Sequence, residues 1–153
     1  QRNYMSQEKS FDYKSFVAAN IGHQVTTIDY LQAIYKAQNL PSDFVLCFAK
    51  LFVPEFKVVD GRIFVAELFD ASVYRDHLSN GLSQATAQFW LNLLEVTGLF
   101  DDLSNEQAVV VAELLSKSWN AKLHTEFDGS YELARVIEDK ETGEIFVVIG
   151  KPD

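Results

Sequence analysis

The chain has 153 residues with a formal net charge of −9 and a pI near 4.7, so an acidic surface dominates. This charge argues against nucleic acid as a partner, since neutralising phosphates requires clustered Lys and Arg. The single cysteine, Cys47, excludes an internal disulfide and a metal site built from several cysteines.

The N-terminal segment and the apolar runs indicate where in the cell we expect the protein. Residues 1–10 are polar and carry no secretory signal, so we expect a cytoplasmic protein. The longest apolar run, residues 44–53, is about half of the roughly 20 residues that a membrane-spanning helix needs. We therefore expect no membrane association. We also expect residues 1–10 to be disordered or foreign to the natural chain, and residues 11–153 to form a single α+β domain.

Two helices are predicted before the first proline-containing turn. Apolar residues recur at helical spacing from residue 11 to residue 21, and Gly22 suits the position after a helix end. A second amphipathic pattern covers residues 26–39 and must stop before Pro41.

The third predicted helix is the most apolar part of the chain. It begins at Ser42, ends before Pro54, and has Lys50 as the one charged residue in its interior. We therefore expect this helix to be buried on most sides, with Cys47 as a core residue.

A β-hairpin is predicted next. Asp60 and Gly61 lie between two runs of alternating apolar residues, which is typical of a type I′ turn joining strands 56–59 and 62–65. Alternation then gives one face to the core, made of Phe56, Val58, Ile63 and Val65.

Three more helices follow the hairpin, over residues 70–79, 84–97 and 105–123. Ser104 with Gln107 forms the capping box that opens the last of them. In the helix 84–97 we expect Phe89, Trp90, Leu93 and Leu94 to face the core, and Gln88, Asn92 and Glu95 to face water. In the last helix we expect Val110 and Leu114 to widen the buried stripe.

A second hairpin closes the chain. Two apolar runs flank the four-residue loop 140–143, whose last residue, Gly143, suits a left-handed position. The fold class is therefore α+β, with about six helices packed on two antiparallel hairpins that we expect to form one sheet.

No arrangement of residues predicts a catalytic, cofactor or metal site. The three histidines lie too far apart for a local metal signature, and no nucleophile elbow or phosphate-binding glycine loop is present. Two weak combinations remain, for which ordinary structural roles are the favoured interpretation: His124, Glu126 and Asp128 as metal ligands, and Asp70, Arg75, Asp76 and His77 as an acid, base and anion clamp.

The outer face of the first hairpin is the main candidate for partner binding. It presents Lys57, Val59, Arg62 and Phe64, an aromatic and cationic group in an acidic protein. The favoured alternative is that a helix, perhaps the first one, covers this face. Asp101 and Asp102 mark an exposed acidic turn that we also expect to contact a partner.

These observations predict a non-enzymatic, acidic interaction domain, for example an immunity or antitoxin-like inhibitor of a basic protein. The alternative is a small ligand-binding or enzymatic domain whose site is assembled from residues distant in sequence. A homo-oligomer formed through the outer hairpin face is compatible with both.

Overall fold

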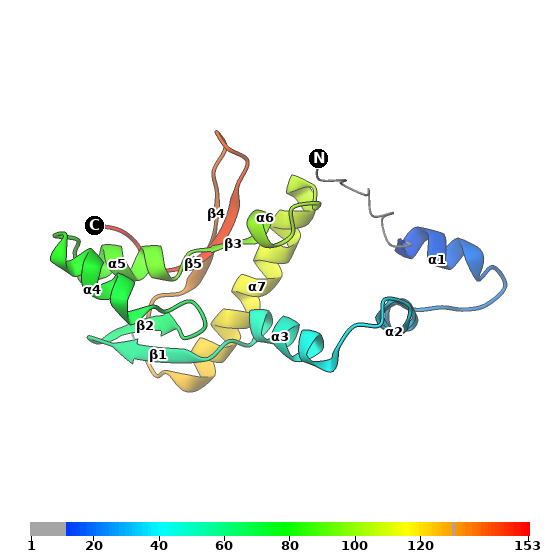
Figure 1. The fold of residues 1–153 in the computed structure, drawn as a ribbon, viewed down its shortest axis with the longest axis horizontal. Helices are drawn as coiled ribbons and strands as arrows, with labels where there is room; N and C mark the ends of the chain where they lie inside the picture. The colour runs from blue at the N-terminus through cyan, green and yellow to red at the C-terminus, as the bar shows by residue number, and fades with distance from the viewer. Residues whose placement is uncertain (1–11, 130) are drawn as a thin grey trace, which may run out of the picture. The chain divides into compact units, whose positions relative to one another are not determined.

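The computed structural model describes residues 12–129 and 131–153 (Figure 1). The expectation for residues 1–10 lies outside this part of the chain. The described residues form an α+β fold with two antiparallel sheets, which confirms the predicted fold class. Contacts divide the chain between Val45 and Leu46 into two compact units, which are described in turn. The single domain stays a prediction.

The first unit contains two short helices, α1 (Tyr13–Ala19) and α2 (Thr27–Ala37), both at the predicted places. Thr26 and Asp29 form a capping box at the start of α2: each side chain accepts a hydrogen bond from the other residue's backbone N–H. The ring of Tyr30 packs against α1. No residue of either helix is buried.

Helix α3 (Ser42–Phe52) has the predicted bounds but lacks the predicted burial. None of its residues is buried, and Cys47 is exposed, so the expectation of a core helix with a core cysteine is wrong. Only Leu51 and Phe52, in its last turn, pack against the main core. Helix α3 therefore has more apolar residues than its contact with the main core uses.

The first sheet is the predicted hairpin, with β1 (Phe56–Val59) and β2 (Arg62–Val65) in the predicted register. Asp60 and Gly61 have φ angles of 50° and 74°, the positive values that a type I′ turn needs. The hairpin face that we expected in the core is only partly buried, because Val58 on this face is 56% exposed.

Strand β2 is buried on both faces, so it separates two apolar clusters. Ile63 and Val65 belong to the main core. Phe64 belongs to a smaller cluster formed with α4 (Ala71–Ser79) and α5 (Gln84–Leu91). Its ring lies 4.9 Å from that of Phe69 and 5.4 Å from that of Tyr74, measured between centroids.

The predicted helix 84–97 is interrupted. Helix α5 ends at Leu91, and strand β3 (Leu94–Glu95) and the short helix α6 (Val96–Leu99) follow. The expected faces are wrong for three residues: Gln88 and Asn92 are buried, whereas Trp90 is 53% exposed. The reason is that both amides bond to the backbone of β2: Nε2 of Gln88 and Nδ2 of Asn92 donate to the Ile63 carbonyl.

The second sheet has three strands in the order β3, β5, β4. The hairpin of β4 (Ala134–Glu138) and β5 (Ile145–Ile149) has the register that a loop at 140–143 predicts. Helix α7 (Asn105–Glu126) lies against this sheet (Figure 1) and buries Leu115, Trp119 and Leu123 in the core. The two hairpins lie in separate sheets, which corrects the expected single sheet.

Among the described helices, none combines the length and the apolar character that crossing a bilayer requires.

Candidate functional site

An apolar groove runs along the second unit between the last turns of α3 and the first turns of α7. It consists of two adjoining hollows of about 210 Å³ and 460 Å³, which share Leu103 and Val111. Both are open to solvent. The side chains that form its walls come from α3, from the loop before α7 and from α7 itself: Phe48, Phe52, Phe100, Leu103, Val110 and Val111.

The α3 wall of the groove is aromatic. Phe48 and Phe52 are one helical turn apart, with ring centroids separated by 5.7 Å. The ring centroid of Phe48 also lies 6.2 Å from that of Phe100, which lines the same hollow. Phe48 remains 40% exposed, so this wall presents aromatic surface to solvent.

Helix α7 holds the C-terminal end of α3 in place. The last carbonyls of a helix have no partner within the helix. Here the indole Nε1 of Trp119 donates to the carbonyl of Leu51 at 2.7 Å, and the Ser118 hydroxyl donates to the carbonyl of Phe52. Lys122 donates to the carbonyl of Pro54, two residues beyond the end of α3. The position of the α3 wall is therefore fixed by side chains on two successive turns of α7.

The α7 wall includes Val110, which we expected to be buried. Val110 is 56% exposed and Leu114, one turn further along α7, is 52% exposed, so the prediction that they widen the buried stripe is wrong. The side of α7 that faces the second sheet instead carries Leu115 and Trp119, which belong to the main core. Of these two residues, Val110 lines the groove and Leu114 does not.

Acidic residues border the groove. Asp101 and Asp102 lie in an exposed turn. The residues on either side of this turn, Phe100 and Leu103, line the groove. Glu106, in the first turn of α7, lines its outer end. None of these three carboxylates takes part in an ion pair with the residues that the structure describes. Their negative charge is therefore available to a cationic ligand.

The outer face of the first hairpin is covered. Phe64 is fully buried and Val59 packs against the same small cluster, beneath α4 and α5. The structure thus shows the alternative of a covered face, although the covering helices are α4 and α5 and not the first helix. Of the predicted residues, Lys57 is exposed, with Nζ 4.2 Å from the centroid of the Phe69 ring.

Arg62 lies at a polar hollow of about 320 Å³ beside the hairpin turn. Its guanidinium donates to Oε1 of Gln88 at 3.0 Å and lies 3.7 Å from Oε1 of Glu132. Gln88 accepts a hydrogen bond from the guanidinium, and Glu132 balances its positive charge. Arg62 therefore joins the hairpin to α5 and to the segment before β4.

Helix α3 also borders an apolar pocket of about 250 Å³, lined by Cys47, Leu51, Leu68 and Trp119 among others. Lys50, at the same pocket, donates to Oε1 of Glu55 at 3.1 Å. That hydrogen bond lowers the pKa of Glu55 below its usual value, and the positive charge of Lys122 is the next largest cause.

Three members of the two weak combinations of polar residues have structural partners. Nδ1 of His124 lies 3.1 Å from the hydroxyl of Tyr131, and Glu126 forms an ion pair with Lys122. Asp70 caps α4. In residues 12–129 and 131–153, no three His, Cys, Asp or Glu side chains come together in a way that would hold a metal ion.

Sequence reasoning did not identify the groove, although it found Asp101 and Asp102 beside it. A signal was present: apolar residues cover nearly the whole circumference of α3, more than one buried face of a helix can use. Comparison with family models, with curated proteins and with solved structures gives no match.

Proposed function

We propose that this protein is a non-enzymatic interaction domain that binds a basic, amphipathic segment of a partner protein in the groove between α3 and α7. The observation that supports this proposal is the combination of an apolar groove with an acidic border. Phe48, Leu103 and Val110 supply the apolar walls, and Asp101 and Asp102 supply the charge.

The shape and chemistry of the groove suit a helical segment. An amphipathic helix binds in such a groove through apolar residues spaced three and four apart, while its polar face stays in water. Positive residues flanking that apolar face would lie next to the acidic border, and the net charge of −9 would accelerate the encounter. An immunity or antitoxin-like inhibitor of a basic protein, acting in the reducing cytoplasm, would use these features.

A second candidate function is the binding of a small apolar ligand. The observation that favours it is the pocket of about 250 Å³ beside Cys47 and Trp119, whose walls are almost entirely apolar. Substitution Leu68→Asp in this pocket would abolish such binding without touching the groove, because Leu68 does not line the groove.

Two synthetic peptides test the main proposal. Both carry Leu at the same helical spacing, and one has Lys and the other Glu at the remaining positions. We expect the Lys peptide to bind by isothermal titration calorimetry, with an affinity that falls as salt is raised, because its charges are attracted by an exposed acidic border. Equal binding of the Glu peptide would contradict the proposal.

Matched variants locate the binding site. Val110→Asp places a charge in the groove and should weaken the Lys peptide by about tenfold or more. Val58→Asp is the control, since Val58 is the same residue type with the same 56% exposure outside the groove. The double substitution D101K/D102K should weaken binding at low salt, whereas E138K/E141K changes the charge equally on the second hairpin and should have a smaller effect. Equal effects of the two double variants would exclude an acidic border that acts locally.

A further inference from the structure

Helix α3 contributes a wall to two cavities of the second unit. The apolar pocket of about 250 Å³ is lined by Cys47, Lys50 and Leu51 from this helix. The groove is lined by Phe48, Leu51 and Phe52 from the same helix. Each set has the i, i+3, i+4 spacing that places residues on one side of a helix. The pocket and the groove therefore lie on neighbouring sides of α3, and Leu51 belongs to both.

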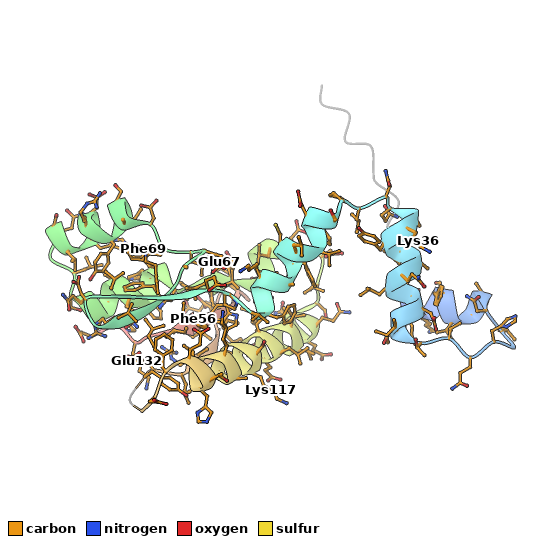
Figure 2. All side chains as sticks on the ribbon, turned by 90° about the horizontal axis from the view of Figure 1, so that it is seen from below. Lys36, Phe56, Glu67, Phe69, Lys117 and Glu132 are labelled. Carbon is orange, nitrogen blue, oxygen red and sulfur yellow. The ribbon has the colours of Figure 1, made fainter. Side chains whose placement is uncertain are left out.

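The other walls of both cavities include buried residues of the main core. Val65, Leu94 and Trp119 line the pocket, and Leu115 lines the groove. Glu67, in the segment after β2, also lines the pocket (Figure 2). Each cavity therefore exists in this form only while α3 lies against the core.

Helix α3 makes few buried contacts with the second unit. None of its residues is buried. Leu51 and Phe52 pack against the main core, and the ring of Phe48 contacts that of Phe100. Side chains of α7 add hydrogen bonds to the carbonyls of Leu51 and Phe52. Because a segment with few buried contacts opens locally at a lower free energy than the core, we expect α3 to exchange between an attached and a detached position.

The chemistry of the pocket selects an uncharged apolar ligand. Its two charged side chains, Lys50 and Glu67, have opposite signs and are both engaged within the protein. Lys50 donates to the carboxylate of Glu55, and the carboxylate of Glu67 accepts from the backbone N–H of Glu55. A cavity of about 150 Å³ already holds benzene, so a pocket of this size accommodates a substituted benzene such as p-xylene.

We propose that a small apolar molecule bound in this pocket strengthens the binding of a partner segment in the groove, and that α3 couples the two sites. This inference rests on the proposed function of the groove. Both ligands contact α3 in its attached position and lose one wall of their site when it detaches. Each ligand therefore raises the population of the state that the other needs. Such coupling is reciprocal, so the two ligands strengthen each other by the same factor.

Titrations of the full chain with p-xylene and the Lys peptide test the coupling. Saturating p-xylene should raise the affinity for the Lys peptide by about fivefold or more in isothermal titration calorimetry, and the Lys peptide should raise the affinity for p-xylene equally. p-Xylene alone should slow the hydrogen exchange of the α3 backbone amides, because it stabilises the attached position.

The outcomes separate this inference from the proposed function. A Lys peptide that binds with the same affinity with and without p-xylene overturns the coupling and leaves the groove as the binding site. If the Lys peptide binds under neither condition, the proposed function of the groove is overturned, and the coupling with it. Slower exchange of the α3 amides in p-xylene would then still support the apolar ligand site.

Two serines of α7 provide matched variants. The hydroxyl of Ser118 donates to the carbonyl of Phe52 in α3, and that of Ser116 donates to the carbonyl of Ala134 in β4. Neither serine lines the pocket or the groove. Ser118→Ala should weaken the Lys peptide in the absence of p-xylene and increase the factor by which p-xylene strengthens it. Ser116→Ala should change neither quantity. Equal effects of the two variants overturn α3 as the coupling element.

Leu68→Asp tests whether p-xylene acts from the pocket. Leu68 lines the pocket and not the groove, so a carboxylate there should abolish the effect of p-xylene on the Lys peptide. Leu133→Asp is the control, because Leu133 is 58% exposed and lines neither cavity, and the effect should persist in this variant. An effect that survives Leu68→Asp, or that is lost with Leu133→Asp, overturns the pocket as the site of the effector.

Discussion

The side-chain carbonyl of Asn92 accepts a hydrogen bond of 2.9 Å from the backbone N–H of Val65, the last residue of β2. The amide nitrogen of the same side chain donates to the carbonyls of Ile63, at 2.9 Å, and Ile149, at 3.1 Å. One fully buried amide thus connects the two-stranded sheet to the end of β5 in the three-stranded sheet. This connection takes the place of the continuous sheet that the two hairpins led us to expect.

Asn92→Leu should destabilise the protein severely. Leucine has a similar volume but forms none of the three hydrogen bonds, so the Val65 N–H and the Ile149 carbonyl lose the partner that Asn92 provides. We expect the free energy of unfolding, measured by urea denaturation, to fall by about 2–4 kcal/mol. Asn105→Ala, at an exposed position, should change it by less than about 0.5 kcal/mol. Similar values for the two variants would show that the bridge contributes little.

Phe64→Ala should also be strongly destabilising, because the ring is fully buried between Phe69 and Tyr74. Removing it leaves a cavity in the small cluster and should cost about 3–5 kcal/mol in thermal or chemical denaturation. Val58→Ala, on the paired strand and 56% exposed, should cost much less. If Phe64→Ala cost no more than Val58→Ala, the face of the hairpin beneath α4 and α5 would have to be open in solution.

The two tryptophans should differ in their access to solvent. Trp90 is 53% exposed and Trp119 is 1% exposed. Acrylamide should therefore quench the fluorescence of the Trp119→Phe variant, which retains Trp90, several-fold more strongly than that of Trp90→Phe. The opposite ranking would restore the expected orientation of α5, with Trp90 facing the core.

Tyr74 should ionise late in an alkaline titration. Burial, followed by its hydrogen bond of 2.7 Å to Oδ2 of Asp60, raises its pKa to about 12 from an ordinary value of 10.0. Because folding favours the neutral phenol, its contribution to stability is complete below pH 10 and is lost as the pH rises from about 10 to about 12. The phenolate absorbance should show a step near pH 12 that disappears in Tyr74→Phe. An unchanged titration curve in that variant would contradict the assignment.

Features that depend on near neighbours in the chain could be predicted from the sequence. The pair Asp60-Gly61 determined both the turn and the register of the first hairpin, because only a few residues suit two consecutive positive φ angles. Ser104 and Gln107 likewise identified the first turn of α7 through a local capping box.

Features that depend on distant neighbours could not be predicted. Whether Gln88 and Asn92 face water or the core depends on free backbone groups of β2, which lie 25 to 29 residues earlier in the chain. The groove was missed for a related reason. Periodicity shows which residues of α3 and α7 are apolar, but not which of their faces another element covers.

The hydrogen bonds that Trp119, Ser118 and Lys122 donate to the last residues of α3 and to Pro54 just after it are all accepted by main-chain carbonyls. Every residue type provides such a carbonyl, so these bonds place no chemical requirement on the side chains of α3. Descendants of this chain are therefore able to exchange groove residues such as Phe48 while the helix stays attached at the same place. A lineage under pressure to recognise a changing partner would have this surface free to diversify without rebuilding its scaffold.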